Sequence, residues 1–207
     1  MRSPEEMIEG YRSFRRGIYK EQAQLYETLA AGQNPNVMLI GCADSRAEPS
    51  DIFNAAPGQL FVVRNVANLV PPYETGGGQH GVSAALEFAV TALEVEHIVI
   101  MGHGGCGGVQ ASLSAADDKP VGQFIAPWVE LLNQARDKVL AEKPDDLQTA
   151  LEFAGVDTSL RNLMTFPFVA ERVKAGKLHL HGARFAIALG QLYWRSADTG
   201  KFELIEA

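Results

Sequence analysis

The stretch HIVIMGHGGCGG, residues 97–108, joins an apolar run to a glycine-rich loop that carries one histidine and one cysteine. A short apolar run bounded by glycine is typical of a buried strand. Gly102, Gly104 and Gly107 have the spacing of the dinucleotide-binding fingerprint. His103 and Cys106 stand three residues apart, a spacing that metal ligands often have. The loop therefore has two interpretations, a phosphate-binding turn or one half of a metal site.

The dinucleotide interpretation needs an acidic residue roughly 20 positions after the glycines, at the end of the next strand, to hold a ribose. The nearest acidic residues lie instead in a polar loop, SAADDKP at 114–120. The glycine motif also follows the third apolar run of the chain and not the first. Because three glycines alone are a weak signal, we favour the metal interpretation.

Other segments around this stretch alternate between strand and helix patterns. Two more apolar runs, VMLIG at 37–41 and LFVV at 60–63, predict buried strands, and a helical pattern covers 79–94. Residues 109–175 look mostly helical with a loop at 114–120. The tail predicts strands joined by turns at 189–190 and 198–201. We therefore expect an α/β fold with a central, mostly parallel sheet covered by helices and extra C-terminal strands.

The N-terminal segment predicts a helical arm at 1–32. Its apolar positions indicate two helices broken near Gly17, with Gly32 as the stop signal. At 207 residues we expect one domain, 1–207, that includes this arm. The apolar faces of the arm favour a homodimer or a higher homo-oligomer.

Charge and cysteine content exclude several classes of protein. A net charge of −7 and a pI near 5.2 argue against nucleic acid or an anionic membrane as a partner. The N-terminus lacks the apolar core of a secretory signal, and no uncharged apolar stretch reaches ~18 residues, so we expect a cytoplasmic protein. The two cysteines, Cys42 and Cys106, then favour metal binding or catalysis over a disulfide.

Both cysteines directly follow predicted strands. Cys42-Ala-Asp44-Ser-Arg46 leaves the run at 37–41, and His103 and Cys106 leave the run at 97–101. Neighbouring parallel strands would bring two thiols and an imidazole together, a donor set that suits Zn²⁺. Asp44 could be a fourth ligand, or it could pair with Arg46 and turn away from the metal. Two plainer interpretations are buried structural cysteines and an ion pair that anchors the loop.

CADSR at 42–46 followed by GHGGCGG at 102–108 resembles the β-class carbonic anhydrases. The resemblance extends to EPSDIFNAAPGQLFVVRNVANLVPPYE at 48–74 and to SLRNLMTFPFV at 159–169, and so covers most of the chain. It implies a zinc enzyme that reversibly hydrates CO2 to bicarbonate and a proton, by attack of zinc-bound hydroxide. The runner-up function is a non-catalytic zinc protein of the same fold that senses bicarbonate or binds a partner. A relative acting on carbonyl sulfide or carbon disulfide is a third alternative.

The resemblance also implies roles for single residues. Cys42, His103 and Cys106 would hold one Zn²⁺ per chain, and Asp44 and Arg46 would be the catalytic pair. Asp44 counts as a possible fourth ligand that stays off the metal at neutral pH. The implied substrate-binding residues are Gln33, Phe61, Val66, Phe88 and Gly107, with Gln33 and Phe61 contributed by a neighbouring subunit.

Departures from the family pattern refine this picture. A second bicarbonate site in some bacterial members uses a Trp and a Tyr, and Leu39 and Phe185 stand at those places here, although the matching Arg64 is kept. We therefore expect the open, plant-like type of site. His179 and His181 alternate along a predicted strand with no cysteine or acidic cluster nearby, which favours a packed or hydrogen-bonded pair over a metal site. His80 and His97 have no partner nearby in the sequence.

Overall fold

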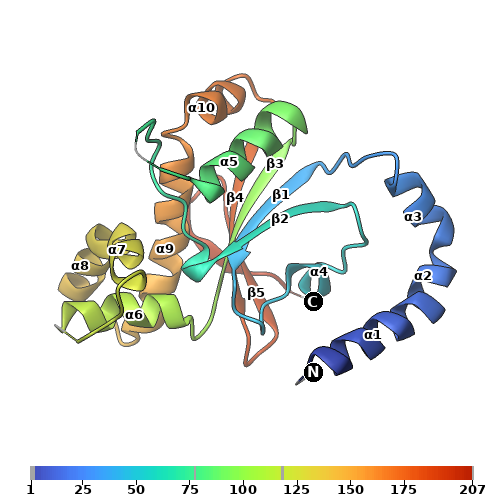
Figure 1. The fold of residues 1–207 in the computed structure, drawn as a ribbon. Helices are drawn as coiled ribbons and strands as arrows, with labels where there is room; N and C mark the ends of the chain where they lie inside the picture. The colour runs from blue at the N-terminus through green and yellow to red at the C-terminus, as the bar shows by residue number, and fades with distance from the viewer. Residues whose placement is uncertain (1–2, 77, 118, 207) are drawn as a thin grey trace. The chain divides into compact units, whose positions relative to one another are not determined.

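The computed structural model describes residues 3–76, 78–117 and 119–206 (Figure 1). The chain divides into two compact units, the first ending at Asn34 and the second beginning at Pro35. The first unit holds helices α1 (Pro4–Arg16), α2 (Ile18–Glu21) and α3 (Ala23–Leu29). None of the described residues in these three helices is buried.

The arm has one break more than the sequence predicted. The break at Gly17 is confirmed, and a second falls at Gln22. The ring centroids of Phe14 and Tyr26 lie 5.8 Å apart. In a straight helix these two residues would stand about 18 Å apart along the axis. The two breaks therefore bend the arm so that its aromatic rings, Tyr19 included, can pack together.

The second unit is built on one six-stranded sheet with the order β2-β1-β3-β4-β5-β6. Its strands are β1 (Val37–Cys42), β2 (Leu60–Asn65), β3 (His97–His103), β4 (His179–Ala186), β5 (Gln191–Arg195) and β6 (Phe202–Leu204). The first four strands of that order pair in parallel, and the last two join antiparallel. The expected α/β fold, with a mostly parallel sheet and extra C-terminal strands, is confirmed.

Helices cover the sheet (Figure 1). The helices of this unit are α4 (Pro49–Ile52), α5 (Gly81–Glu87), α6 (Gly107–Ala116), α7 (Ile125–Val129), α8 (Asn133–Glu142), α9 (Leu147–Leu163) and α10 (Pro167–Lys174), with short turns of 3₁₀-helix at 66–68 and 130–132. Side chains from α5, α9 and α10 pack with Ile40, Ile98 and Ile100 of the sheet in one core cluster. Alternate strand residues, among them Leu39 and Val99, pack with α4 on the opposite face.

Two local predictions need correction. The loop expected at 114–120 starts later, because α6 continues to Ala116 and its end is closed by backbone bonds at Asp117. The helix expected at 79–94 begins at Gly81 and becomes a π-helix at Phe88–Ala92. No helix within the described ranges is both long and apolar enough to cross a membrane.

Candidate metal centre

Three donor atoms meet where β1 and β3 end. Cys42 is the last residue of β1, His103 is the last residue of β3, and Cys106 caps the start of α6. The two strands are parallel neighbours, with Ile40 opposite Ile100, so their carboxyl ends lie side by side. The three ligand atoms lie within 4.8 Å of one another, and the residues are only 5%, 1% and 1% exposed. The structure thus brings together the three residues that the sequence predicted as ligands.

The geometry of these donors fits a zinc ion. The two sulfur atoms are 3.9 Å apart. Two Zn–S bonds at a tetrahedral angle span about 3.8 Å. The ring of His103 places Nδ1 3.1 Å from the carbonyl oxygen of Gly104. Its buried Nε2 has no hydrogen-bond partner in the described structure. A histidine whose Nδ1–H is engaged by a carbonyl presents the lone pair of Nε2, which is the form that binds metals.

The pKa values of the two thiols are shifted in opposite directions. The hydrogen bond with Cys106 lowers the pKa of Cys42, and contacts with His103 and with the backbone N–H groups of Asp44 and Ala67 add to this against the effect of burial. The same hydrogen bond, together with burial, raises the pKa of Cys106. Burial would lower the pKa of His103, but the contact with Cys42 and the negative charge on its sulfur outweigh burial and raise that pKa. A thiolate is therefore favoured at this centre, first at Cys42.

The start of α6 supports charge on the second sulfur. Backbone N–H groups of Val109 and Gly108 bond to the sulfur of Cys106 and oppose the rise in its pKa. N–H groups in the first turn of a helix have no carbonyl partner inside the helix. The positive end of the helix dipole also lies at this turn, beside the sulfur of Cys106. Four backbone donors thus face the two sulfurs, two at each. Such hydrogen bonds orient thiolate ligands and reduce the charge that they transfer to a metal.

Asp44 and Arg46 form a bidentate pair beside the donors. Arg46 Nε and Nη2 lie 2.9 Å and 2.7 Å from the two carboxylate oxygens of Asp44, and the backbone N–H of Arg46 adds a third bond of 3.0 Å. These bonds from Arg46 hold the pKa of Asp44 well below its usual range. Arg46 also donates to the carbonyl of Gly105, so it links the two loops. Asp44 Oδ2 is 3.8 Å from His103 Nε2, which places an ionised carboxylate next to the candidate ligands.

The glycines of the loop each meet a different requirement. Gly105 has a φ of +66°, a conformation that side-chain-bearing residues rarely adopt. A Cβ at Gly104 would stand 3.2 Å from the guanidinium of Arg184. At Gly108 a Cβ would lie 2.5 Å from Val66 Cγ1 and 2.9 Å from the Cβ of Ala67. The glycine run therefore serves a tight turn and close packing, and α6 begins at Gly107.

Arg64 holds the Cys42 loop from the neighbouring strand. Its guanidinium donates to the carbonyls of Cys42 at 2.9 Å and Asp44 at 2.6 Å, and it pairs with Glu48. The arginine is thus engaged by this loop, while Leu39 is packed in the core.

A buried ion pair behind Cys106 escaped the sequence analysis. Glu152 on α9 and Arg184 on β4 are 2% and 7% exposed, with nitrogen–oxygen distances of 2.8 Å and 2.6 Å. Glu152 also accepts the backbone N–H of Cys106 at 3.1 Å, and Gln148 donates to the Cys106 carbonyl at 3.0 Å. The sequence signal was weak, because Glu152 is one of three charged residues on α9, with Asp157 and Arg161. A buried ion pair is stable only when its hydrogen bonds are complete, as they are here.

The predicted substrate-binding residues fall into separate places. Val66 lies against the start of α6, where its Cγ1 packs beside Gly108. Phe61 and Phe88 contact each other, with ring centroids 5.9 Å apart. Phe61 stands four residues before the end of β2, about 13 Å from the strand end that faces Cys42. Gln33 belongs to the N-terminal unit. One chain therefore gathers the metal donors and Val66, but it does not bring Phe61 to them.

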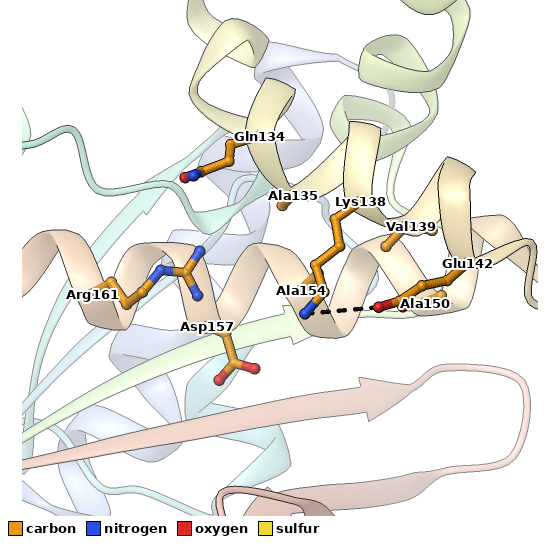
Figure 2. A pocket seen from close by; sticks show the side chains of 9 residues that line it. All are labelled: Gln134, Ala135, Lys138, Val139, Glu142, Ala150, Ala154, Asp157 and Arg161. Carbon is orange, nitrogen blue, oxygen red and sulfur yellow. Dashed lines mark ion pairs between the residues drawn. The ribbon is translucent and has the colours of Figure 1, made fainter.

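A surface groove of about 530 Å³ lies elsewhere, between α8 and α9 (Figure 2). Lys138 and Glu142 form an ion pair along one side, while Asp157 and Arg161 project from α9. No residue that lines this groove belongs to the predicted site.

Comparison with known proteins identifies the family. Residues 37–192 match the model of the family described as carbonic anhydrase. "Beta carbonic anhydrase 3" of Arabidopsis thaliana is 36% identical over 192 residues, which are 90% of this chain and 74% of the relative. The structure of the β-carbonic anhydrase CcaA is 31% identical with a TM-score of 0.90, covering 98% of this chain and 92% of that one. A tetrameric β-carbonic anhydrase of Sordaria macrospora is 28% identical with a TM-score of 0.84, covering 96% and 98%.

The chain belongs to the β-class carbonic anhydrases. It is an enzyme that interconverts CO2 and bicarbonate, and its cofactor is zinc. The family assignment agrees with the donor set of two thiols and one imidazole at this centre.

Proposed function

We propose that Cys42, His103 and Cys106 hold the zinc ion of this enzyme, and that Asp44 with Arg46 completes its active site. The observation that carries the proposal is the position of the Asp44 carboxylate, paired with Arg46 and 3.8 Å from the orphaned Nε2 of His103. When bound, zinc lowers the pKa of a coordinated water and so supplies a nucleophile near neutral pH. The residues of the chain then have to orient that nucleophile and hold the substrate.

Asp44 acts as a hydrogen-bond acceptor in this arrangement. Because Arg46 keeps its pKa low, Asp44 is ionised at neutral pH and has no proton to donate. Two of the three bonds from Arg46 fill Oδ1, while Oδ2 faces His103. An acceptor fixed on both sides aligns the attacking water without a reorganisation cost. The pairing with Arg46 also supports the open type of site, with Asp44 off the metal at neutral pH.

The substrate CO2 is small and almost apolar, so it needs an apolar wall and few donors. Val66 supplies part of that wall next to the metal centre. Gly107 is the first residue of α6, and its backbone N–H can donate a hydrogen bond to the bicarbonate product. Gln33 and Phe61 reach the pocket from a neighbouring subunit, because within one chain Phe61 lies too far along β2, and Phe88 adds to the apolar wall.

A site built from two subunits requires a homo-oligomer, and two observations support one. Helices α1–α3 bury none of their described residues, and Met7, Ile8 and Tyr11 expose apolar surface that a second copy could cover. A related structure is described as tetrameric. The arm therefore belongs to the working enzyme, and the molar mass from light scattering tests this assembly. We place the enzyme in the cytoplasm, since two free thiol ligands suit a reducing compartment.

The test is stopped-flow CO2 hydration with the bound zinc quantified in each sample. We expect Asp44→Asn to keep one zinc per chain and to lose about 10²- to 10⁴-fold in rate. Asp117→Asn is the matched control, because Asp117 pairs with the residue two positions on but lies exposed on the surface. Wild-type rates in Asp44→Asn with full zinc would refute the role of Asp44. A fully zinc-loaded wild type without hydration activity would refute the function as a whole.

A further inference from the structure

Three histidines gather at the amino end of the sheet, on the edge away from the metal centre. His97 opens β3, and His179 opens β4 with His181 two residues further on. The strands are parallel with His97 opposite His179 and Val99 opposite His181. Residues two apart share a face of a strand, so all three imidazoles project from the same face. His97 and His103 are separated by about 20 Å of β3, so this cluster is distinct from the cysteine centre.

The rings contact one another directly. His97 Nδ1 and His181 Nε2 are 3.1 Å apart. The ring centroids of His97 lie 5.2 Å from His181 and 5.4 Å from His179. Two imidazole nitrogens bound to one tetrahedral zinc ion stand about 3.3 Å apart, given Zn–N bonds of about 2.05 Å. The nitrogens of His97 and His181 are therefore already at the separation that a shared metal ion requires.

The surroundings give a metal ion access and favour the neutral form of His181. His179 is exposed and lines a surface pocket of about 470 Å³. The other lining residues are Glu94, Glu96, Arg172, Gly176 and Lys177, and Arg172 is engaged by Glu94. On the inner side, Trp194 lies against His181 at 5.6 Å between ring centroids. Burial and the neighbouring histidines lower the pKa of His181, which favours the neutral ring that binds metals.

We propose that His97, His179 and His181 form a second metal site, which takes a divalent ion of the imidazole-preferring class, with Zn²⁺ as the type case. His97 and His181 supply the preformed pair of ligands. The described residues show only the cysteine centre as a group of three donors within 4.8 Å, so His179 must turn its exposed ring inward to become the third ligand. The alternative is a plain hydrogen bond between the imidazoles of His97 and His181.

The experiment uses the full-length enzyme with zinc already at the cysteine centre. Equilibrium dialysis against buffered free Zn²⁺ at pH 7.5, with zinc and protein quantified, gives the zinc bound per chain. We expect two zinc ions per chain in the wild type. In His97→Gln and in His181→Gln the affinity of the second should fall at least about tenfold. His80→Gln is the matched control, because His80 lies outside the cluster and contacts the carbonyl of Gly76.

Each outcome decides the proposal. Circular dichroism of the variants confirms that they are folded, and retention of the first zinc confirms that the cysteine centre is intact. One zinc per chain in the wild type over the whole range of free zinc would overturn the second site. So would a second zinc that survives unchanged in both His97→Gln and His181→Gln, because it would then be bound elsewhere.

Discussion

Strand β3 carries a histidine at each end, and the two ends hold their histidines in different ways. At the carboxyl end, His103 is buried with two cysteines, and backbone N–H groups and the Glu152–Arg184 pair fix the adjoining loop. At the amino end, His97 is half-buried and its described contacts are mainly other rings. A histidine at a strand end can therefore be fixed by hydrogen bonds and ion pairs in the adjoining loop, or by contacts with side chains of the neighbouring strand.

The largest loss of stability should follow from disrupting the buried Glu152–Arg184 ion pair next to Cys106. We expect Glu152→Gln to destabilise the fold by about 3 kcal/mol, because it leaves the buried guanidinium of Arg184 without its countercharge. The chemical denaturation curve of the zinc-loaded protein measures this loss. Asp157→Asn is the control on the same helix, since the Asp157–Arg195 pair is one-third exposed and should contribute only about 0–1 kcal/mol. Equal losses in the two variants would show that the carboxyl end has no special support.

The next effect concerns the close packing at the start of α6. We expect Gly108→Ala to cost about 1–3 kcal/mol, because its Cβ would overlap Val66 and Ala67. Gly107→Ala, one residue earlier, meets no atom within 4 Å and should be neutral or slightly stabilising. Thermal unfolding of both variants gives the difference. If the two substitutions had the same effect, the packing of α6 on the 66–68 turn would not matter for the centre.

The smallest effect should appear at the amino end, in the dependence of stability on pH. The folded pKa of His181 is lowered by burial first, and then by His97 and His179. The unfolded chain therefore binds the proton more readily, so this contribution to stability is present above pH 6.5 or so and is lost as the pH falls. Among charged groups, Glu94, Glu96, Arg172 and Lys177 line the adjoining pocket. The free energy of unfolding, measured without added metal at several pH values from 7.5 to 5, should decrease less steeply for His181→Gln than for the wild type. Parallel curves would contradict this reasoning.

The sequence predicted the elements of this fold well because its signals lie along the chain. The apolar runs at 37–41, 60–63 and 97–101 became β1, β2 and β3, each extended by one or two residues. Those extra residues include Cys42 and His103, so two of the proposed ligands lie on the strands themselves. The second break in the arm was missed because it depends on the contact between Phe14 and Tyr26, which no local pattern encodes.

By itself, the sequence determined the α/β architecture, the family and the group of Cys42, His103 and Cys106. Apolar periodicity, motif spacing and the meeting of parallel strand ends are all readable along one chain. Only the tertiary structure decided that Glu152 and Arg184 stand behind Cys106 and that His97 faces His181. Those contacts depend on which strands are neighbours, on their register and on where a helix packs. A register shift of one residue would turn every side chain of a strand to the other face, and the sequence does not state the register.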